Sequence, residues 1–101
     1  MNKAINKTLS MLVPVLNQTG ERIESIEAVR NWYKAEDYEG VEREYMKEVA
    51  EIVFENGVKR YADIGSDSNL AAIYDITAVL LQIKPQSTAI ERIERGVYEY
   101  E

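Results

Sequence analysis

The sequence predicts an all-α fold, a compact single domain of four to five helices over residues 1–101 with a short extended segment at its C-terminal end. Three observations support this prediction. Apolar residues recur at intervals of three and four along most of the chain, and glycine, proline and short polar clusters separate these stretches. The composition, 46% apolar and 30% charged, is that of an ordinary globular protein. A chain of 101 residues has room for one such domain.

The first helix is predicted to begin near Lys3, and the second to span residues 21–37. Pro14 is expected to kink or end the first helix, because proline lacks a backbone N–H and its ring clashes with the preceding turn. A polar turn that ends at Gly20 separates the two helices, and glutamates at the start of the second suit the positive end of its dipole. In the first helix, apolar residues recur at helical spacing, namely Ile5, Leu9, Leu12, Val13 and Leu16. In the second, Ile23, Ile26, Arg30 and Tyr33 lie along one face.

A third helix is predicted over residues 41–55, and the Asn-Gly pair at 56–57 is expected to stop it. Residues 58–65 are short, mixed and bounded by glycines, and their pattern is compatible with a loop, a helical turn or a brief strand. The apolar stripe of the third helix consists of Val41, Tyr45, Val49, Ile52 and Val53. Tyr45 is therefore expected in the core.

A fourth helix is predicted over residues 68–84, after the capping residues at 66–68, and Pro85 ends it. Apolar residues cover much of its circumference, so it is expected to be central to the domain or to an oligomer, and a homodimer is the favoured assembly. A short fifth helix is predicted to follow over residues 88–95. The alternating tail at 97–101 indicates an edge strand or an extended arm.

The composition also limits the chemistry. The chain has no histidine and no cysteine, which removes the usual zinc ligands, cysteine nucleophiles and Ser-His-Asp triads. Glutamate pairs three residues apart are frequent, but the Glu-x-x-Asp motif that accompanies them in helical magnesium-dependent pyrophosphohydrolases is absent. We therefore expect a non-enzymatic protein without a cofactor or a metal. No stretch approaches the roughly 20 apolar residues that a membrane span needs, so a cytoplasmic location is expected.

The acidic and aromatic segment at residues 32–45 is the main candidate for a functional surface. Aromatic anchors with a polar rim are typical of protein interfaces, and the net charge of −6 disfavours direct binding of nucleic acid. The alternative is that Trp32 packs in the core and the tyrosines cover helix ends. The candidate partner-binding residues are Trp32, Tyr33, Glu36, Asp37, Tyr38, Glu39, Glu42 and Glu44.

From this surface we expect a module that binds another protein, such as a small acidic inhibitor or regulator. Its carboxylates would imitate phosphates in the basic groove of a nucleic-acid-binding protein, or else would steer association while the aromatic side chains supply affinity. Small acidic inhibitors from phages and other mobile elements are similar in size and charge. That similarity is one of composition and identifies no family.

The alternative function is DNA binding. Residues 75–96 loosely resemble a helix-turn-helix, because a helix, a short turn and a second helix are predicted there. In this interpretation Lys84, Arg92 and Arg95 contact DNA, and Lys3 and Lys7 form a supporting arm. Glutamates in the second helix would face phosphates unfavourably, which weakens the resemblance.

Overall fold

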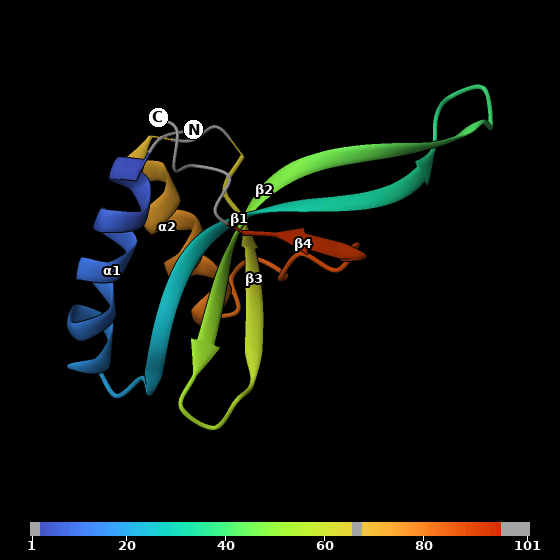
Figure 1. The fold of residues 1–101 in the computed structure, drawn as a ribbon. Coiled ribbons are helices and arrows are strands. Elements are labelled where there is room, and N and C mark those ends of the chain that lie inside the picture. The colour runs from blue at the N-terminus through green and yellow to red at the C-terminus, as the bar shows by residue number, and fades with distance from the viewer. Residues whose placement is uncertain (1–2, 66–67, 96–101) are drawn as a thin grey trace.

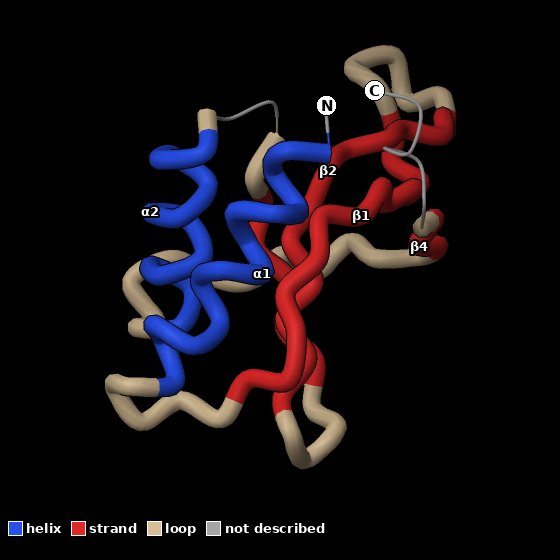
Figure 2. The backbone as a smooth tube through the Cα atoms, turned by 60° about the vertical axis from the view of Figure 1, so that its left-hand side comes forward, coloured by secondary structure: helices blue, strands red, loops and turns tan. Residues whose placement is uncertain are grey.

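The computed structural model describes residues 3–65 and 68–95, which form a four-stranded antiparallel sheet with two helices on one of its faces (Figure 1). Figure 2 shows the helices as one layer and the strands as the other. The strands are ordered β3-β2-β1-β4 across the sheet. The elements in chain order are α1 (Lys3–Asn17), β1 (Ile23–Glu36), β2 (Glu42–Phe54), β3 (Lys59–Asp63), α2 (Asn69–Leu80) and β4 (Arg92–Glu94).

The predicted all-α fold is wrong because its second and third helices are the two longest strands, β1 and β2. A bulge between Ile23 and Ser25 shifts the register of β1. As a result Ile23 and Ile26 both reach the core although they are three residues apart. A bulge thus produces in a strand the spacing that normally indicates a helix.

In β2 the helical pattern arises because the strand is covered on both faces. Four consecutive residues from Val49 to Ile52 are buried. Ala50 and Ile52 face the helices, whereas Val49 and Glu51 point to the opposite face. A strand that is buried on both sides loses the alternation of apolar and polar residues by which strands are recognised.

The cover on the second face is the crossing segment, residues 85–91, which runs from the edge of β3 to the edge of β1. Ser87 donates its backbone N–H to the carbonyl of Tyr61 in β3 (2.8 Å), and the side-chain amide of Asn31 in β1 donates to the carbonyl of Ala89 (3.2 Å). The predicted fifth helix over residues 88–95 is therefore wrong. Hydrogen bonds to the sheet hold this stretch extended, and its end becomes β4.

Two predicted helices are confirmed. The first is α1, although Pro14 does not end it, because the helix continues to Asn17. The second is α2, where the hydroxyl of Ser68 accepts the N–H of Ala71 as an N-cap. It ends several residues before the predicted boundary, and Gln82 beyond it has a φ of 62°. No helix in the described part of the chain is long and apolar enough to cross a membrane.

Residues 59–63, which the sequence left unassigned, are β3. The Asn-Gly pair that was expected to stop a helix instead forms the turn before this strand, and Gly57 supplies its positive φ of 87°. The expected extended tail at 97–101 lies outside the described residues.

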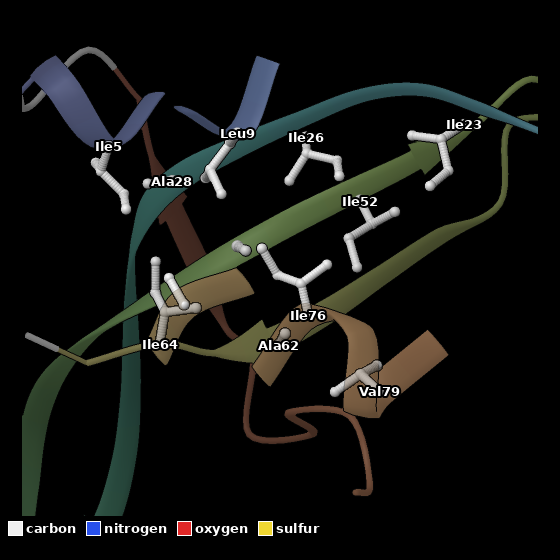
Figure 3. Close-up of a cluster of buried hydrophobic side chains, with 12 residues drawn as sticks. Ile5, Leu9, Ile23, Ile26, Ala28, Ile52, Ala62, Ile64, Ile76 and Val79 are labelled. Atoms are coloured by element: carbon white, nitrogen blue, oxygen red, sulfur yellow. The ribbon is translucent and has the colours of Figure 1, made fainter. Parts of the chain in front are cut away.

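One hydrophobic core lies between the helices and the sheet (Figure 3). Its members include Ile5, Leu9, Ile23, Ile26, Ala28, Ile52, Ala62, Ile64, Ile76 and Val79.

Candidate functional site

Beyond the part of the sheet that the helices cover, β1 and β2 continue as a two-stranded hairpin that extends away from the body of the protein (Figure 1). We call residues 32–46 the distal hairpin. Its pairing is regular from Trp32 opposite Met46 to Glu36 opposite Glu42. Directly opposite residues of antiparallel strands share one face, so this register determines which side chains lie together.

On the helix side of the distal hairpin, Trp32 and Met46 lie opposite each other. Arg92 of β4 places its guanidinium 5.3 Å from the centre of the Trp32 ring, within range of a cation–π interaction. The same guanidinium donates to Glu44 at 3.0 Å. The indole N–H of Trp32 is buried and has no hydrogen-bond partner among the described residues. Arg92 therefore fixes the tryptophan ring and pairs with one of the hairpin carboxylates.

On the opposite face, Tyr33 and Tyr45 form a stacked pair with ring centroids 5.8 Å apart. The ammonium group of Lys47 lies 5.0 Å from the centre of the Tyr33 ring and pairs with Asp63 of β3 at 3.2 Å. Both tyrosines are half-buried by these contacts. They stiffen the hairpin at the point where it leaves the sheet.

The turn at the end of the hairpin is organised by Asp37. Its carboxylate accepts the backbone N–H groups of Glu39 (2.8 Å) and Val41 (3.0 Å), and Arg43 donates to its second oxygen at 2.6 Å. The hydrogen bond from Arg43, followed by that from the Val41 amide, lowers the pKa of Asp37 from its ordinary value of 3.8. Within this braced turn, Tyr38 exposes 97% of its surface.

The remaining carboxylates make the hairpin end strongly negative. Glu36 and Glu42 are directly opposite each other, and like charges in that position repel. Glu39 adds a third exposed carboxylate in the turn. Among the residues that the structure describes, no ion pair involves any of these three groups, whereas Asp37 and Glu44 are paired with arginines. With five carboxylates against Lys34 and Arg43, the distal hairpin carries a net charge of −3.

All eight predicted partner-binding residues lie in the distal hairpin, but on two strands and a turn rather than on two helices. They do not share one face. Trp32, Glu36, Glu42 and Glu44 lie on the helix side, Tyr33 lies on the opposite side, and Asp37, Tyr38 and Glu39 form the turn.

Three further residues of the site were missed. Tyr45, which the helical interpretation placed in the core, stacks on Tyr33 instead. Met46 faces Trp32, and Arg43 braces the turn. Cross-strand pairing is the signal that would have identified them, and it appears once residues 31–47 are considered as a hairpin.

The helix-turn-helix proposed for DNA binding is not formed, because α2 is followed by the crossing segment and β4. Its three predicted DNA contacts are engaged with carboxylates. Lys84 pairs with Asp75 at 2.7 Å, and Arg92 pairs with Glu44. Arg95 pairs with Glu27 (2.6 Å) and Glu51 (2.7 Å). Lys3 and Lys7 belong to α1.

A second polar cluster lies on the helix-free face, around Glu51, which is 3% exposed. Besides Arg95, its carboxylate accepts the hydroxyl of Tyr61 at 3.1 Å and lies 3.9 Å from the Lys59 ammonium. The hydrogen bond from Arg95 lowers the pKa of Glu51, while burial and the neighbouring carboxylate raise the pKa of Tyr61. A carboxylate with this many donors is a weak base, and its evident role is to attach the end of β4 to the sheet.

No group of three or more acidic side chains within residues 3–65 and 68–95 is arranged to hold a metal ion. No protein-family model matches the chain, and comparisons with curated proteins and with solved structures give no significant match.

Proposed function

We propose that the protein is a binding module that docks on a partner protein through the distal hairpin. The observation that carries this proposal is Tyr38, which is 97% exposed on a turn that three hydrogen bonds to Asp37 hold in place. Tyrosine is enriched among the residues that dominate binding energy at interfaces. A rigid turn presents such a residue at a small cost in conformational entropy, because little freedom is lost on binding.

The rest of the distal hairpin supports this role. Its two strands carry aromatic or sulfur-containing side chains on both faces, where Trp32 and Met46 lie on one and Tyr33 and Tyr45 on the other. The stack and the contact with Arg92 keep these groups ordered before a partner arrives. A partner that encloses the distal hairpin from its turn to its base would therefore meet preformed apolar surface on each side.

The excess of negative charge on the distal hairpin supports a basic partner. Glu36 and Glu42 form the last strand pair before the turn that holds Tyr38, and Glu39 follows Tyr38 in that turn, so we infer a basic, concave surface of the kind by which proteins bind nucleic acids. Carboxylates that occupy such a groove would compete with phosphates, and the protein would then act as an inhibitor or regulator. If the charges only steered association, their removal would change the rate of binding more than the affinity.

Affinity capture with matched baits tests the proposal. Immobilised wild-type protein, Tyr38→Ala and Val58→Ala would be exposed in parallel to a lysate of the organism that encodes the chain. Val58 is an exposed apolar residue in the turn between β2 and β3, far from Tyr38 along the sheet. We expect at least one protein that the wild type and Val58→Ala retain and that Tyr38→Ala loses. Identical retention by all three baits would refute docking through Tyr38.

A further inference from the structure

A second surface, separate from the distal hairpin, lies on the outer side of α2. The inner side of this helix packs on the core through Ala72, Ile76 and Val79. The outer side exposes large apolar groups, with Leu70 at 78% and Leu81 at 64% exposed. A shallow, largely apolar hollow of about 670 Å³ lies beside Leu70 on this side of the helix. It is lined by Ser68, Leu70, Ala71, Ile73, Tyr74 and Thr77.

The spacing on this outer side is that of a helix-pairing seam. Leu70, Tyr74, Thr77 and Leu81 follow one another at intervals of four, three and four, which is the a/d spacing of a heptad repeat. The hydroxyl of Thr77 donates to the carbonyl of Ile73 at 2.8 Å, so it requires no partner across an interface. A second helix with the same spacing would fit along this seam.

We propose that α2 pairs with α2 of a second copy of this chain, in antiparallel orientation around a two-fold axis. In that arrangement Leu70 faces Leu81 of the second copy at each end of the seam. Tyr74 faces Thr77 of the second copy at the centre, so a large residue meets a small one beside the hollow. A two-fold interface requires one surface to be complementary to itself, and this seam meets the requirement.

The charges around the seam permit a second copy as its occupant. Two chains that each carry a net charge of −6 repel one another, and they approach most easily through a neutral surface. The seam residues are uncharged, and the nearby Asp75 and Lys84 neutralise each other at 2.7 Å. The acidic distal hairpin extends from the opposite side of the molecule (Figure 1). This interface therefore keeps the two acidic hairpins apart.

The pairing also has a functional consequence. A dimer through α2 directs one distal hairpin outward from each copy. A partner that is itself symmetric, or that carries repeated basic sites, would then be bound by two hairpins with increased avidity. This consequence rests on the proposed function, whereas the dimer itself does not.

Sedimentation equilibrium of the full chain tests the pairing. The wild type should approach twice the 11.6 kDa mass of one chain as its concentration rises. Leu70→Glu/Leu81→Glu places like charges opposite each other and should remain at 11.6 kDa. Leu70→Glu/Leu81→Lys places opposite charges across an antiparallel seam and should still dimerise. Val41→Glu/Val58→Glu is the control, because it adds the same charge at exposed apolar sites outside α2 and should dimerise like the wild type.

A wild type that stays at the monomer mass at every concentration would overturn the proposal. So would a dimer that survives in folded Leu70→Glu/Leu81→Glu, since the seam would then not be the interface. Loss of the dimer in both charged variants would refute the antiparallel orientation, because a parallel seam sets like charges against each other in each of them. Circular dichroism of every variant establishes that it is folded. Removal of Tyr38 should leave the dimer unchanged, which separates this test from that of the distal hairpin.

Discussion

Tyr33 and Tyr45 stack across the distal hairpin with ring centroids 5.8 Å apart and ring planes inclined by 29°. They are directly opposite in the register of β1 and β2. The stack lies outside the hydrophobic core, where a two-stranded ribbon has little other support. The stacked pair therefore contributes to the rigidity of the surface that we propose for docking.

The energy of this stack can be measured. A double-mutant cycle of Tyr33→Ala and Tyr45→Ala should give a coupling of about 0.5–1.5 kcal/mol in the free energy of unfolding, as aromatic pairs do. Urea unfolding of the four proteins supplies the values. The same cycle with Tyr38→Ala in place of Tyr33→Ala should give a coupling near zero, because Tyr38 is almost fully exposed. Equal coupling in both cycles would contradict the assigned pairing.

Acid should loosen the turn that presents Tyr38. The pKa of Asp37 is lowered from 3.8, chiefly by Arg43, so its stabilising effect is fully present above pH 3.8 and is lost as the pH falls through the lower folded value. NMR spectra recorded during an acid titration should show the amide signals of Glu39 and Val41 shifting with a midpoint below 3.8. Asp37→Asn should abolish this titration, while a midpoint above 3.8 in the wild type would contradict the contact with Arg43.

The opposed carboxylates of Glu36 and Glu42 should affect stability and binding in opposite directions. Glu36→Gln removes a like-charge pair and should stabilise the hairpin by roughly 0.2–1 kcal/mol at low salt. The same change should weaken partner capture and reduce its dependence on salt, because one attractive charge is lost. Glu24→Gln, an exposed substitution near the other end of β1, is the charge-matched control and should leave capture unaltered. Stronger capture by Glu36→Gln would exclude a basic partner surface.

Glu51 and Arg95 form a pair whose disruption should be costly. Arg95→Ala leaves the carboxylate of Glu51 buried without its main donor and should destabilise the protein by about 1–3 kcal/mol at neutral pH. Glu51→Gln in that background should recover part of the loss, since no buried charge then remains. Arg95 lowers the pKa of Glu51 from 4.5, so the stability that the pair contributes should be fully present above pH 4.5 and be lost as the pH falls through the lower folded value. Additive effects in the double variant would contradict the pairing.

The sequence predicts α1, α2 and the location of the candidate site, but not the sheet. Helical spacing identifies α1 and α2 correctly, because each packs one apolar face against the core. The same reasoning fails for β1 and β2 for two physical reasons. The bulge at Ile23 introduces a spacing of three, and the crossing segment buries the second face of β2. Both effects depend on contacts between distant segments, which a local pattern does not contain.

For the candidate site, the sequence reveals which residues take part but not how they are arranged. The aromatic and acidic residues of the distal hairpin are evident from composition alone, since that segment combines Trp32 with clustered tyrosines and carboxylates. Their arrangement is not evident, because it follows from the pairing of β1 with β2. On a helix Trp32 and Tyr33 would be about 100° apart, whereas in β1 they lie on opposite faces. Arg92 joins the site only through the β4 pairing, across sixty residues of chain.

The most direct test of the central claim is site-specific photo-crosslinking from the end of the distal hairpin. Tyr38 would be replaced by p-benzoylphenylalanine, which keeps an aromatic ring and reacts on irradiation with groups in contact. The same replacement at Val58 is the matched control. We predict a discrete crosslinked product with a host protein from position 38 and none from position 58, and excess unlabelled wild type should suppress it. No product from position 38, or the same product from both positions, would contradict docking through the distal hairpin.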